Sequence, residues 1–546
     1  MRIKLLISSL AVLFFAYQAN ATEILLPDTN DTGGFFDNAA VPAKIIKAKH
    51  EFNESNLRGA LIIYREVLEI EPENSTALYW TARCHYGLKK YDLAKRYLTK
   101  AVEADAKAAD NIDFFYGKIH HRLAELDEAI ASYQKFLDKS GSKSALDEED
   151  AAQFMAQCKY AKEMMANPVN VTIANMGTEV NTRFDEYAPA VTANGKRLYF
   201  TSRRSTSVGG EIDEGGDYKF FEDVYYTAWS DEKESWANSR GVDGEVNTAT
   251  YDAILSIAPD GNQMYVYRNN QNSAGDIFVA SYDVHEDSWR APMKLPKPVN
   301  TSYFESSVSI TSDGEKLYFI SERPEGNGQG DIYVSSKVGA DGWSKPKNLG
   351  KVINTELDEK FVFIHPNGKT LYFASNGHQT LGGYDIFRSE FVNGQWSIPV
   401  NLGYPINTVN EESTFSLTSN NKTLFIAAEY GDALGERDIY QVDVSNYDLL
   451  SKGYEKSSYA TLILNVQDAA GKNVKGAQVR IMLAVGSQRI LVDEKTDKLG
   501  NVRVNLPGGV TYKVEAISKK MAATKEITMT MNKTGETVVK ENIQFN

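Results

Sequence analysis

The segment "GEKLYFISERPEGNGQGDIYVSSKVGADGWSKPKNLGKVINT", Gly314 to Thr355, contains the repeating unit of the central part of the chain. An apolar strand, "KLYFIS", is followed by a variable loop and then by "DIY", which begins a second strand. A tryptophan and a short strand lead to Asn-Thr, where the next unit begins. Alternating apolar residues separated by turns rich in Gly, Asp and Asn are typical of antiparallel strands. The unit therefore predicts a small antiparallel sheet.

This unit recurs five times over residues 168–445. The spacings between successive Asn-Thr pairs are 66, 53, 54 and 53 residues, counted from Asn181, Asn247, Asn300, Asn354 and Asn407. The longer first spacing reflects an insertion at Ser207 to Glu222. Four strands in a unit of this length match one blade of a β-propeller. We therefore predict a propeller of five blades; six would need a unit that the sequence does not show.

One strand of the repeat is displaced along the chain. The fifth unit ends after "DIYQVDVSN" and lacks the final strand, whereas "VTIANMGTEVNT", Val171 to Thr182, resembles a final strand with no unit before it. A closed propeller must pair its first and last blades so that no edge stays open. We therefore expect the segment 171–177 to close the propeller as the outer strand of the fifth blade.

The preceding region, residues 41–167, has helical periodicity. Three units repeat every 34 residues or so, and the unit from Ala77 to Ala108 has small and large residues where a tetratricopeptide repeat (TPR) packs its helices. The segment Ala145 to Met165 is expected to be a helix that caps the stack. Cys84 and Cys158 then lie about two repeats apart, which is too far for a disulfide bond.

The first helix of each repeat carries a candidate binding surface. Equivalent positions hold apolar residues, and the positions four residues later hold basic ones: Ile45, Tyr79 and Phe114, then Lys49, Arg83 and Lys118. Such helices line the concave groove of a repeat stack. An apolar row beside a basic row suits an acidic-aromatic peptide. The alternative is that these are ordinary solvated and inter-helix positions, and the sequence leaves both interpretations open.

Five carboxylates recur at one position of the propeller unit, five residues after each Asn: Glu186, Asp252, Glu305, Glu359 and Glu412. They could converge at the mouth of the channel and hold a cation such as Ca²⁺ or a basic ligand. Alternatively, each could accept backbone hydrogen bonds in its own turn. Their presence in every unit favours the structural interpretation. We expect no other metal or cofactor.

The two ends of the chain have different patterns. Residues 1–21 begin with Arg2 and Lys4, continue with an apolar run and end in Ala-Asn-Ala, as a secretory signal peptide does; the run is short for a membrane anchor. Residues 22–40 are expected to be flexible. After a linker at 446–457, alternating strands over 458–546 predict a small antiparallel β-sandwich. A net charge of −14 argues against binding to nucleic acid.

These motifs resemble known families. The Asn-Thr, "LYF" and "DIY" motifs resemble the WD40-like repeat of the TolB family, and "GAQVRI" and "YKVEA" are similar to carboxypeptidase regulatory-like, transthyretin-type domains. The domain order resembles the PorE group of Bacteroidetes envelope proteins, associated with type IX secretion. This resemblance implies a partner such as an outer-membrane protein of the PorP/SprF type. The chain lacks the OmpA-like domain and the lipid-anchored cysteine common in that group. Attachment through a protein partner is therefore expected rather than peptidoglycan binding.

The sequence lacks the common catalytic motifs, including G-x-S-x-G, H-E-x-x-H and a phosphate-binding loop. We therefore expect a non-enzymatic periplasmic scaffold, not inserted in a membrane, that binds an outer-membrane protein or a component of type IX secretion or gliding. The alternative is a soluble module that binds a peptide, glycan or cation at the propeller mouth. A hydrolase with scattered carboxylates is a weaker third hypothesis.

Overall fold

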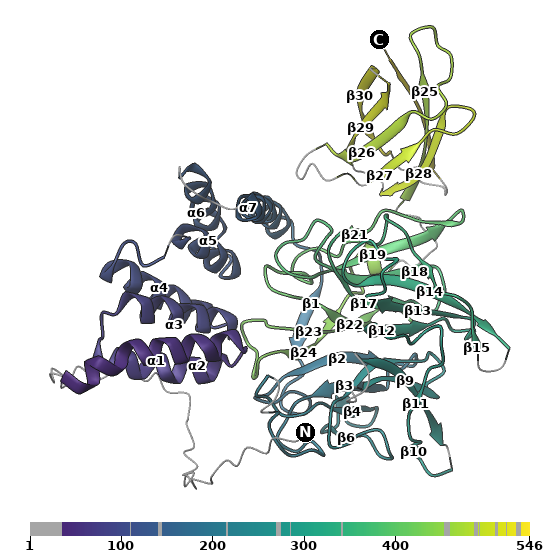
Figure 1. Ribbon diagram of the computed structural model, residues 1–546. Coiled ribbons are helices and arrows are strands. Elements are labelled where there is room, and N and C mark those ends of the chain that lie inside the picture. The colour runs from purple at the N-terminus through teal and green to yellow at the C-terminus, as the bar shows by residue number, and fades with distance from the viewer. Residues whose placement is uncertain are drawn as a thin grey trace, which may run out of the picture.

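In the computed structural model of the chain, a helical region is followed by two regions of β-sheet (Figure 1). The structure describes residues 35–109, 111–139, 145–213, 217–268, 275–283, 285–339, 342–451, 459–484, 490, 492–507, 511–519, 521–530 and 537–545. The predicted signal peptide and most of the predicted segment 22–40 lie outside these residues. Of the helices in the described ranges, none is long and apolar enough to cross a membrane.

The described residues of the first region form the helices α1 (Phe35–Asn53), α2 (Leu57–Ile70), α3 (Ser75–Gly87), α4 (Tyr91–Ala104), α5 (Ile112–Arg122), α6 (Leu126–Asp138) and α7 (Ala145–Ala166). The side chains of Asn56 and Asn74 cap α2 and α3, each accepting a backbone N–H at 2.9 Å. Consecutive helices pack in pairs. The helices approach one another closely because small, fully buried residues lie between them, namely Ala48, Ala60 and Ala82. These pairs are the predicted repeats, and α7 follows them as the predicted capping helix.

Both cysteines are free and buried, as the predicted repeat spacing requires. Cys84 lies in the core of the first two helix pairs, whereas Cys158 lies in a separate core formed with α5, α6 and α7. Burial raises the pKa of each thiol to about 12, so neither is a reactive thiolate at neutral pH.

The helical stack rests on loops of the following sheet region. Leu381 and Val409 from those loops belong to the same apolar core as α7. Arg122 donates to the backbone oxygen of Val409 at 2.6 Å, and a ring nitrogen of His121 lies 2.7 Å from the backbone oxygen of Leu381. These contacts place the stack at the end of the sheets where such loops gather.

The sheet region contains short, regular strands: β1 (Thr172–Asn175), β2 (Glu186–Val191), β3 (Arg197–Ser202), β4 (Asp223–Ser230), β5 (Ser235–Trp236), β6 (Arg240–Gly241), β7 (Asp252–Ile257), β8 (Gln263–Arg268), β9 (Asp276–Asp283), β10 (Ser288–Trp289), β11 (Met293–Lys294), β12 (Glu305–Ile310), β13 (Lys316–Ser321), β14 (Asp331–Val338), β15 (Gly342–Trp343), β16 (Lys347–Asn348), β17 (Glu359–Ile364), β18 (Thr370–Ser375), β19 (Asp385–Val392), β20 (Gln395–Trp396), β21 (Val400–Asn401), β22 (Thr414–Leu417), β23 (Thr423–Ala428) and β24 (Asp438–Asp443). Each unit of the sequence repeat forms one antiparallel sheet.

In four of these sheets, three longer strands pair in chain order and two very short strands share the outer position. In the third, for example, β12, β13 and β14 pair in order, and both β15 and β16 pair with β14. The last sheet, β22-β23-β24, takes its outer strand from the other end of the region. There β1 pairs antiparallel with β24, with Ile173 opposite Val442. This is the pairing that the displaced segment predicts.

The sheets follow one another in a ring. The strand β2 lies against β7 on one side and β22 on the other, and β12 lies against β7 and β17. Phe361 of β17 and Phe415 of β22 share one core, which links the last two sheets. Sheets arranged in this way around an axis define a β-propeller. Five such sheets are found in the described residues of this region.

A repeated asparagine joins each sheet to the next unit. Asn354 accepts a hydrogen bond from the N–H of Ile332 at 2.8 Å and donates one to its carbonyl oxygen at 3.0 Å. The side-chain amide therefore bonds the edge of the strand as the backbone of a neighbouring strand would. Asn181 makes the same two bonds, at 2.8 and 2.9 Å, with Ile439, 258 residues away. The first Asn-Thr of the repeat therefore belongs structurally to the last sheet.

After the short helix α8 (Asp448–Ser451), the described residues of the last region form the strands β25 (Tyr459–Gln467), β26 (Gln478–Leu483), β27 (Val492–Lys495), β28 (Asn501–Pro507), β29 (Thr511–Ser518), β30 (Met521–Thr528) and β31 (Thr537–Gln544). Two sheets, β28-β25-β31 and β27-β26-β29-β30, share one core that includes Leu462 and Val479. The prediction of a wholly antiparallel region is wrong, because β31 runs parallel to β25. This strand enters the other sheet after β30, so the chain crosses between the sheets. The second half of the predicted linker 446–457, residues 452–457, lies outside the described residues.

Candidate partner-binding groove

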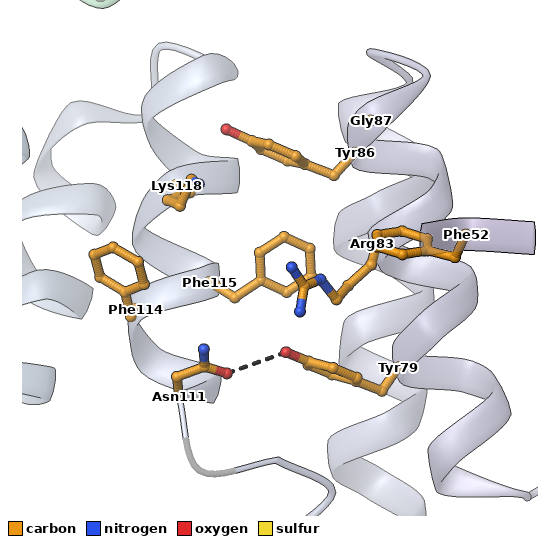
Figure 2. Close-up of a pocket in the computed structure, with 9 residues that line it drawn as sticks. All are labelled: Phe52, Tyr79, Arg83, Tyr86, Gly87, Asn111, Phe114, Phe115 and Lys118. Carbon is orange, nitrogen blue, oxygen red and sulfur yellow. Dashed lines mark hydrogen bonds between the residues drawn. The ribbon is translucent and has the colours of Figure 1, made fainter. Parts of the chain in front are cut away.

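A cavity of about 230 Å³ opens between the first helices of the repeats (Figure 2). Its walls come from the end of α1, from one face of α3, and from the first turns of α5 with the residue before it. Most of the lining is aromatic, with two cations among the rings: Phe52, Tyr79, Arg83, Tyr86, Gly87, Asn111, Phe114, Phe115 and Lys118. We call this site the TPR groove.

Arg83 is held in the TPR groove by aromatic rings. Its guanidinium lies 5.0 Å from the ring centroid of Trp80, 5.5 Å from that of Phe52 and 6.0 Å from that of Tyr79. Figure 2 shows it reaching into the space between α3 and α5. Within the described part of the chain, no carboxylate forms an ion pair with it. Cation–π contacts of this kind are weak, about 0.5–1 kcal/mol at exposed sites. No described carboxylate therefore competes with an incoming anion for this guanidinium.

Lys118 is held in a similar way on α5. Its ammonium lies 5.4 Å from the ring centroid of Tyr86, 5.8 Å from that of Phe114 and 6.0 Å from that of Phe154. The described residues again provide no carboxylate in an ion pair with this group. Elsewhere on the stack, Lys89 and Lys95 do pair with carboxylates. The TPR groove thus presents two cations without acidic partners in a chain that is acidic as a whole.

A hydrogen bond fixes the base of the groove. The hydroxyl of Tyr79 donates to Oδ1 of Asn111 at 3.0 Å, which joins α3 to the residue just before α5 (Figure 2). Burial raises the pKa of Tyr79, although the neighbouring Arg83 opposes this shift. The hydroxyl therefore stays protonated and keeps donating at neutral pH.

The structure brings together four of the six residues predicted for this surface: Tyr79, Arg83, Phe114 and Lys118. The other two lie outside the lining. Ile45 is partly buried against the core of α1 and α2, and the exposed Lys49 lies 5.0 Å from the ring centroid of Trp80.

Sequence reasoning missed several lining residues, of which Phe52 and Tyr86 left a signal. Each lies seven residues, about two helical turns, after a predicted position, Ile45 or Tyr79, so each shares its helix face. Phe115 was harder to predict, because helical spacing assigned the adjacent Phe114, and not Phe115, to the face that lines the groove.

The five recurring carboxylates have a different role. All are fully buried, and each accepts hydrogen bonds from the threonine four residues earlier in its own turn. Glu305, for example, accepts from the backbone N–H of Thr301 at 2.8 Å and from its hydroxyl at 2.6 Å. In the described residues, no three His, Cys, Asp or Glu side chains are grouped so that they could hold a metal ion. The interpretation of Glu186, Asp252, Glu305, Glu359 and Glu412 as a ring for a cation or basic ligand is therefore wrong for these residues, because their side chains are enclosed.

Among the described residues, three of these carboxylates form an ion pair with an arginine and two do not. Arginines pair with Glu186, Asp252 and Glu305, at 3.2, 2.7 and 3.3 Å. In the last two sheets the residue that aligns with Arg204 and Arg323 is glycine or tyrosine. Burial therefore raises the pKa of both Glu359 and Glu412 to about 7.

These raised pKa values predict a pH-dependent stability of the sheet region. An unfolded glutamate has a pKa of 4.5, so the folded state binds more protons between pH 4.5 and about 7. The free energy of unfolding should therefore fall as the pH rises through that window, by on the order of 3 kcal/mol per carboxyl. Denaturant unfolding at both ends of the window measures this change.

The double variant Glu359→Gln, Glu412→Gln is the control for this effect, because it removes both titrations. His121, whose pKa burial lowers to about 4, contributes a slope of opposite sign in wild type and variant alike. The difference between the two proteins therefore isolates the carboxyls. Identical pH profiles would contradict the assignment.

Comparisons with known proteins find partial likenesses. A family model described as "Anaphase-promoting complex, cyclosome, subunit 3" matches residues 53–136, which span α2 to α6 and are TPR-type helical repeats. No curated protein matches the chain.

Among solved structures, TolB from Acinetobacter baumannii is 13% identical, with a TM-score of 0.30, covering 56% of this chain and 72% of its own. An α-L-arabinofuranosidase from Podospora anserina is 14% identical, with a TM-score of 0.31 and coverage of 51% and 94%. The Yersinia enterocolitica type III secretion chaperone SycD, solved with a peptide of the translocator YopD, is 14% identical, with a TM-score of 0.22 and coverage of 24% and 99%.

Proposed function

We propose that this chain is a non-enzymatic adaptor of the bacterial periplasm that binds an acidic-aromatic segment of a protein partner in the TPR groove. It carries a TPR stack, a five-bladed propeller closed by the segment 171–177 and a terminal β-sandwich in series. The partner is an outer-membrane protein of the PorP/SprF type or a component of type IX secretion or gliding, as the resemblance to the PorE group implies. Through it the exported adaptor is held at the outer membrane.

The observation that carries the proposal is that Arg83 and Lys118 contact aromatic rings and form no ion pair with any carboxylate that the structure describes. A carboxylate that enters the TPR groove gains charge-assisted hydrogen bonds without displacing an acidic neighbour. An aromatic side chain of the same segment packs against the exposed parts of Phe52 and Tyr86. Because the chain is acidic overall, these two cations also distinguish the groove from the rest of the surface.

The placement of the perturbed acids supports a non-enzymatic role. Catalytic acids and bases usually combine a shifted pKa with access to a cleft. Glu359 and Glu412 have raised pKa values, but they are fully buried in turns between sheets. Their titration bears on stability rather than on a reaction.

A photo-crosslinking amino acid in place of Tyr86 tests whether a partner occupies the TPR groove. Illumination of living cells is expected to link this position to one predominant envelope protein, which mass spectrometry identifies. The same amino acid in place of Ile62, which is 60% exposed on α2, is the matched control and should give no such product. Equal products from both positions, or none from Tyr86, would contradict the proposal that a partner binds in the TPR groove.

A further inference from the structure

A second groove lies between the first two sheets of the propeller, away from the TPR stack. It has a volume of about 640 Å³, within the range of about 300–1,000 Å³ usual for small-molecule sites. The turns after β2 and β7 form one side of it, and the ends of β4 and β9 contribute Trp229 and Tyr282. The stack contacts Glu429, which follows β23, and Glu436, which precedes β24; these lie at the other end of the strands. The second groove is therefore separate from the TPR groove and shares no lining residue with it.

Aromatic side chains distinguish this interface from the others. At the seventh residue of the third strand, the first sheet has Trp229 and the second has Tyr282, whereas the third has Lys337 and the fourth has Phe391. The fifth unit has Val444 at the equivalent position, so the first two sheets are the neighbouring pair in which both carry an aromatic residue there. Both rings are half-buried. Trp229 packs edge-to-face against Trp236, with ring centroids 5.5 Å apart, so the packing holds it in place. A smaller cavity beside it shares Tyr282 and continues to Trp289.

The charges of the groove are balanced by neighbours. Lys196 forms an ion pair with Asp231, and Arg197 reaches the hydroxyl of Tyr282 at 3.5 Å. The carboxylate of Asp260 accepts the backbone N–H of Asn262 at 3.0 Å. Two basic and two acidic side chains thus leave the groove close to neutral. A strongly charged ligand would gain little here.

We propose that this groove binds a neutral oligosaccharide. Sugar rings present C–H faces that pack on aromatic rings, and their hydroxyls both donate and accept hydrogen bonds. Trp229 and Tyr282 supply the rings at the two sides of the groove. Asn194 and Asn262 are exposed in the two turns. The oxygen of Asn194 already accepts from Thr192 and Lys196, so Asn194 supplies an N–H donor, whereas Asn262 supplies an amide oxygen and Asp260 a carboxylate as acceptors. The site adds a glycan contact to the adaptor and does not depend on the TPR groove.

The full-length protein tests this proposal by titration with neutral hexasaccharides: the cello-, xylo-, manno- and chito-oligosaccharides. At least one is expected to bind saturably and to change the tryptophan fluorescence. Trp229→Ala and, separately, Asn262→Ala should weaken that binding at least tenfold. Because Asn262 is exposed in a turn, its variant keeps the test valid if Trp229→Ala is unstable. Lys337→Ala, at the position equivalent to Trp229 in the third sheet, should bind as the wild type does.

Three results would overturn the proposal. The first is no saturable binding of any of these sugars to the wild-type protein. The second is binding that survives in both groove variants. The third is preference for an anionic polysaccharide with strong salt dependence, which would show that charge rather than ring packing selects the ligand.

Discussion

Replacing Asn181 by alanine is expected to lower the free energy of unfolding of the propeller by about 2–4 kcal/mol. The amide of Asn181 bonds both the N–H and the carbonyl oxygen of Ile439, which lies in the last sheet. Alanine leaves the buried N–H of Ile439 unbonded, which costs about 1–3 kcal/mol. It also removes one of two hydrogen bonds to the carbonyl oxygen, which still accepts the N–H of Met176 at 3.2 Å, and this loss costs about 1 kcal/mol. The loss falls where the ring of sheets closes, because β1 and Asn181 both contact β24.

Tryptophan fluorescence during denaturant unfolding measures this effect, because five of the six tryptophans lie in the propeller. Asn354→Ala removes the same pair of bonds between neighbouring units and should destabilise to a similar extent. Asn238→Ala, in an exposed loop, should change little. If Asn181→Ala behaves like Asn238→Ala while Asn354→Ala destabilises, the first Asn-Thr does not close the ring.

The closure was predictable because the repeat motif is local and strict. Asn348 donates to Asp331 at 2.6 Å and accepts from Gly350 and Asn354, and the same short pattern occurs at Asn175. There Asn175 donates to Asp438 at 2.8 Å, in the unit that lacks a final strand. The outer strand that the fifth unit lacks could thus be matched to the segment 171–177 from the sequence alone.

The TPR groove was only partly predictable. Helical spacing identifies which residues share a face, and it found Tyr79, Arg83 and Lys118. It does not show how deep a groove is or where it ends, because these depend on how each helix pair is rotated against the next. Ile45 and Lys49 therefore fall outside the cavity, although their sequence positions are equivalent.

Two other features could not be predicted from the sequence, because they too depend on how distant parts of the chain pack together. The spacing of the five carboxylates fits both a channel ring and buried turns, and only the burial of Glu359 and its equivalents distinguishes the two. The parallel pairing of β31 with β25 joins residues far apart in the chain, and no local pattern encodes it.

Reversing both cations of the TPR groove is expected to remove the partner. In the double variant Arg83→Glu, Lys118→Glu, two charge-assisted hydrogen bonds, each contributing about 1.5–3 kcal/mol, are replaced by repulsion. Affinity for an acidic segment should fall by at least about a hundredfold. The neutral variant Arg83→Gln, Lys118→Gln should bind at an intermediate level, because it removes the attraction without adding repulsion.

The matched control reverses two cations on the outer helices of the stack. Arg65 on α2 and Arg96 on α4 are exposed, and the described residues give neither an ion pair with a carboxylate. The variant Arg65→Glu, Arg96→Glu therefore makes the same change in net charge outside the groove. Thermal unfolding of each variant checks that the stack remains folded.

The most direct measurement is the recovery of the crosslinked partner from native envelopes with wild-type protein, the groove variant and the outer-helix variant. The adaptor account predicts that one envelope protein is recovered with the wild type and the outer-helix variant and is lost with the groove variant. Recovery of that protein with a folded groove variant at the wild-type level would contradict it.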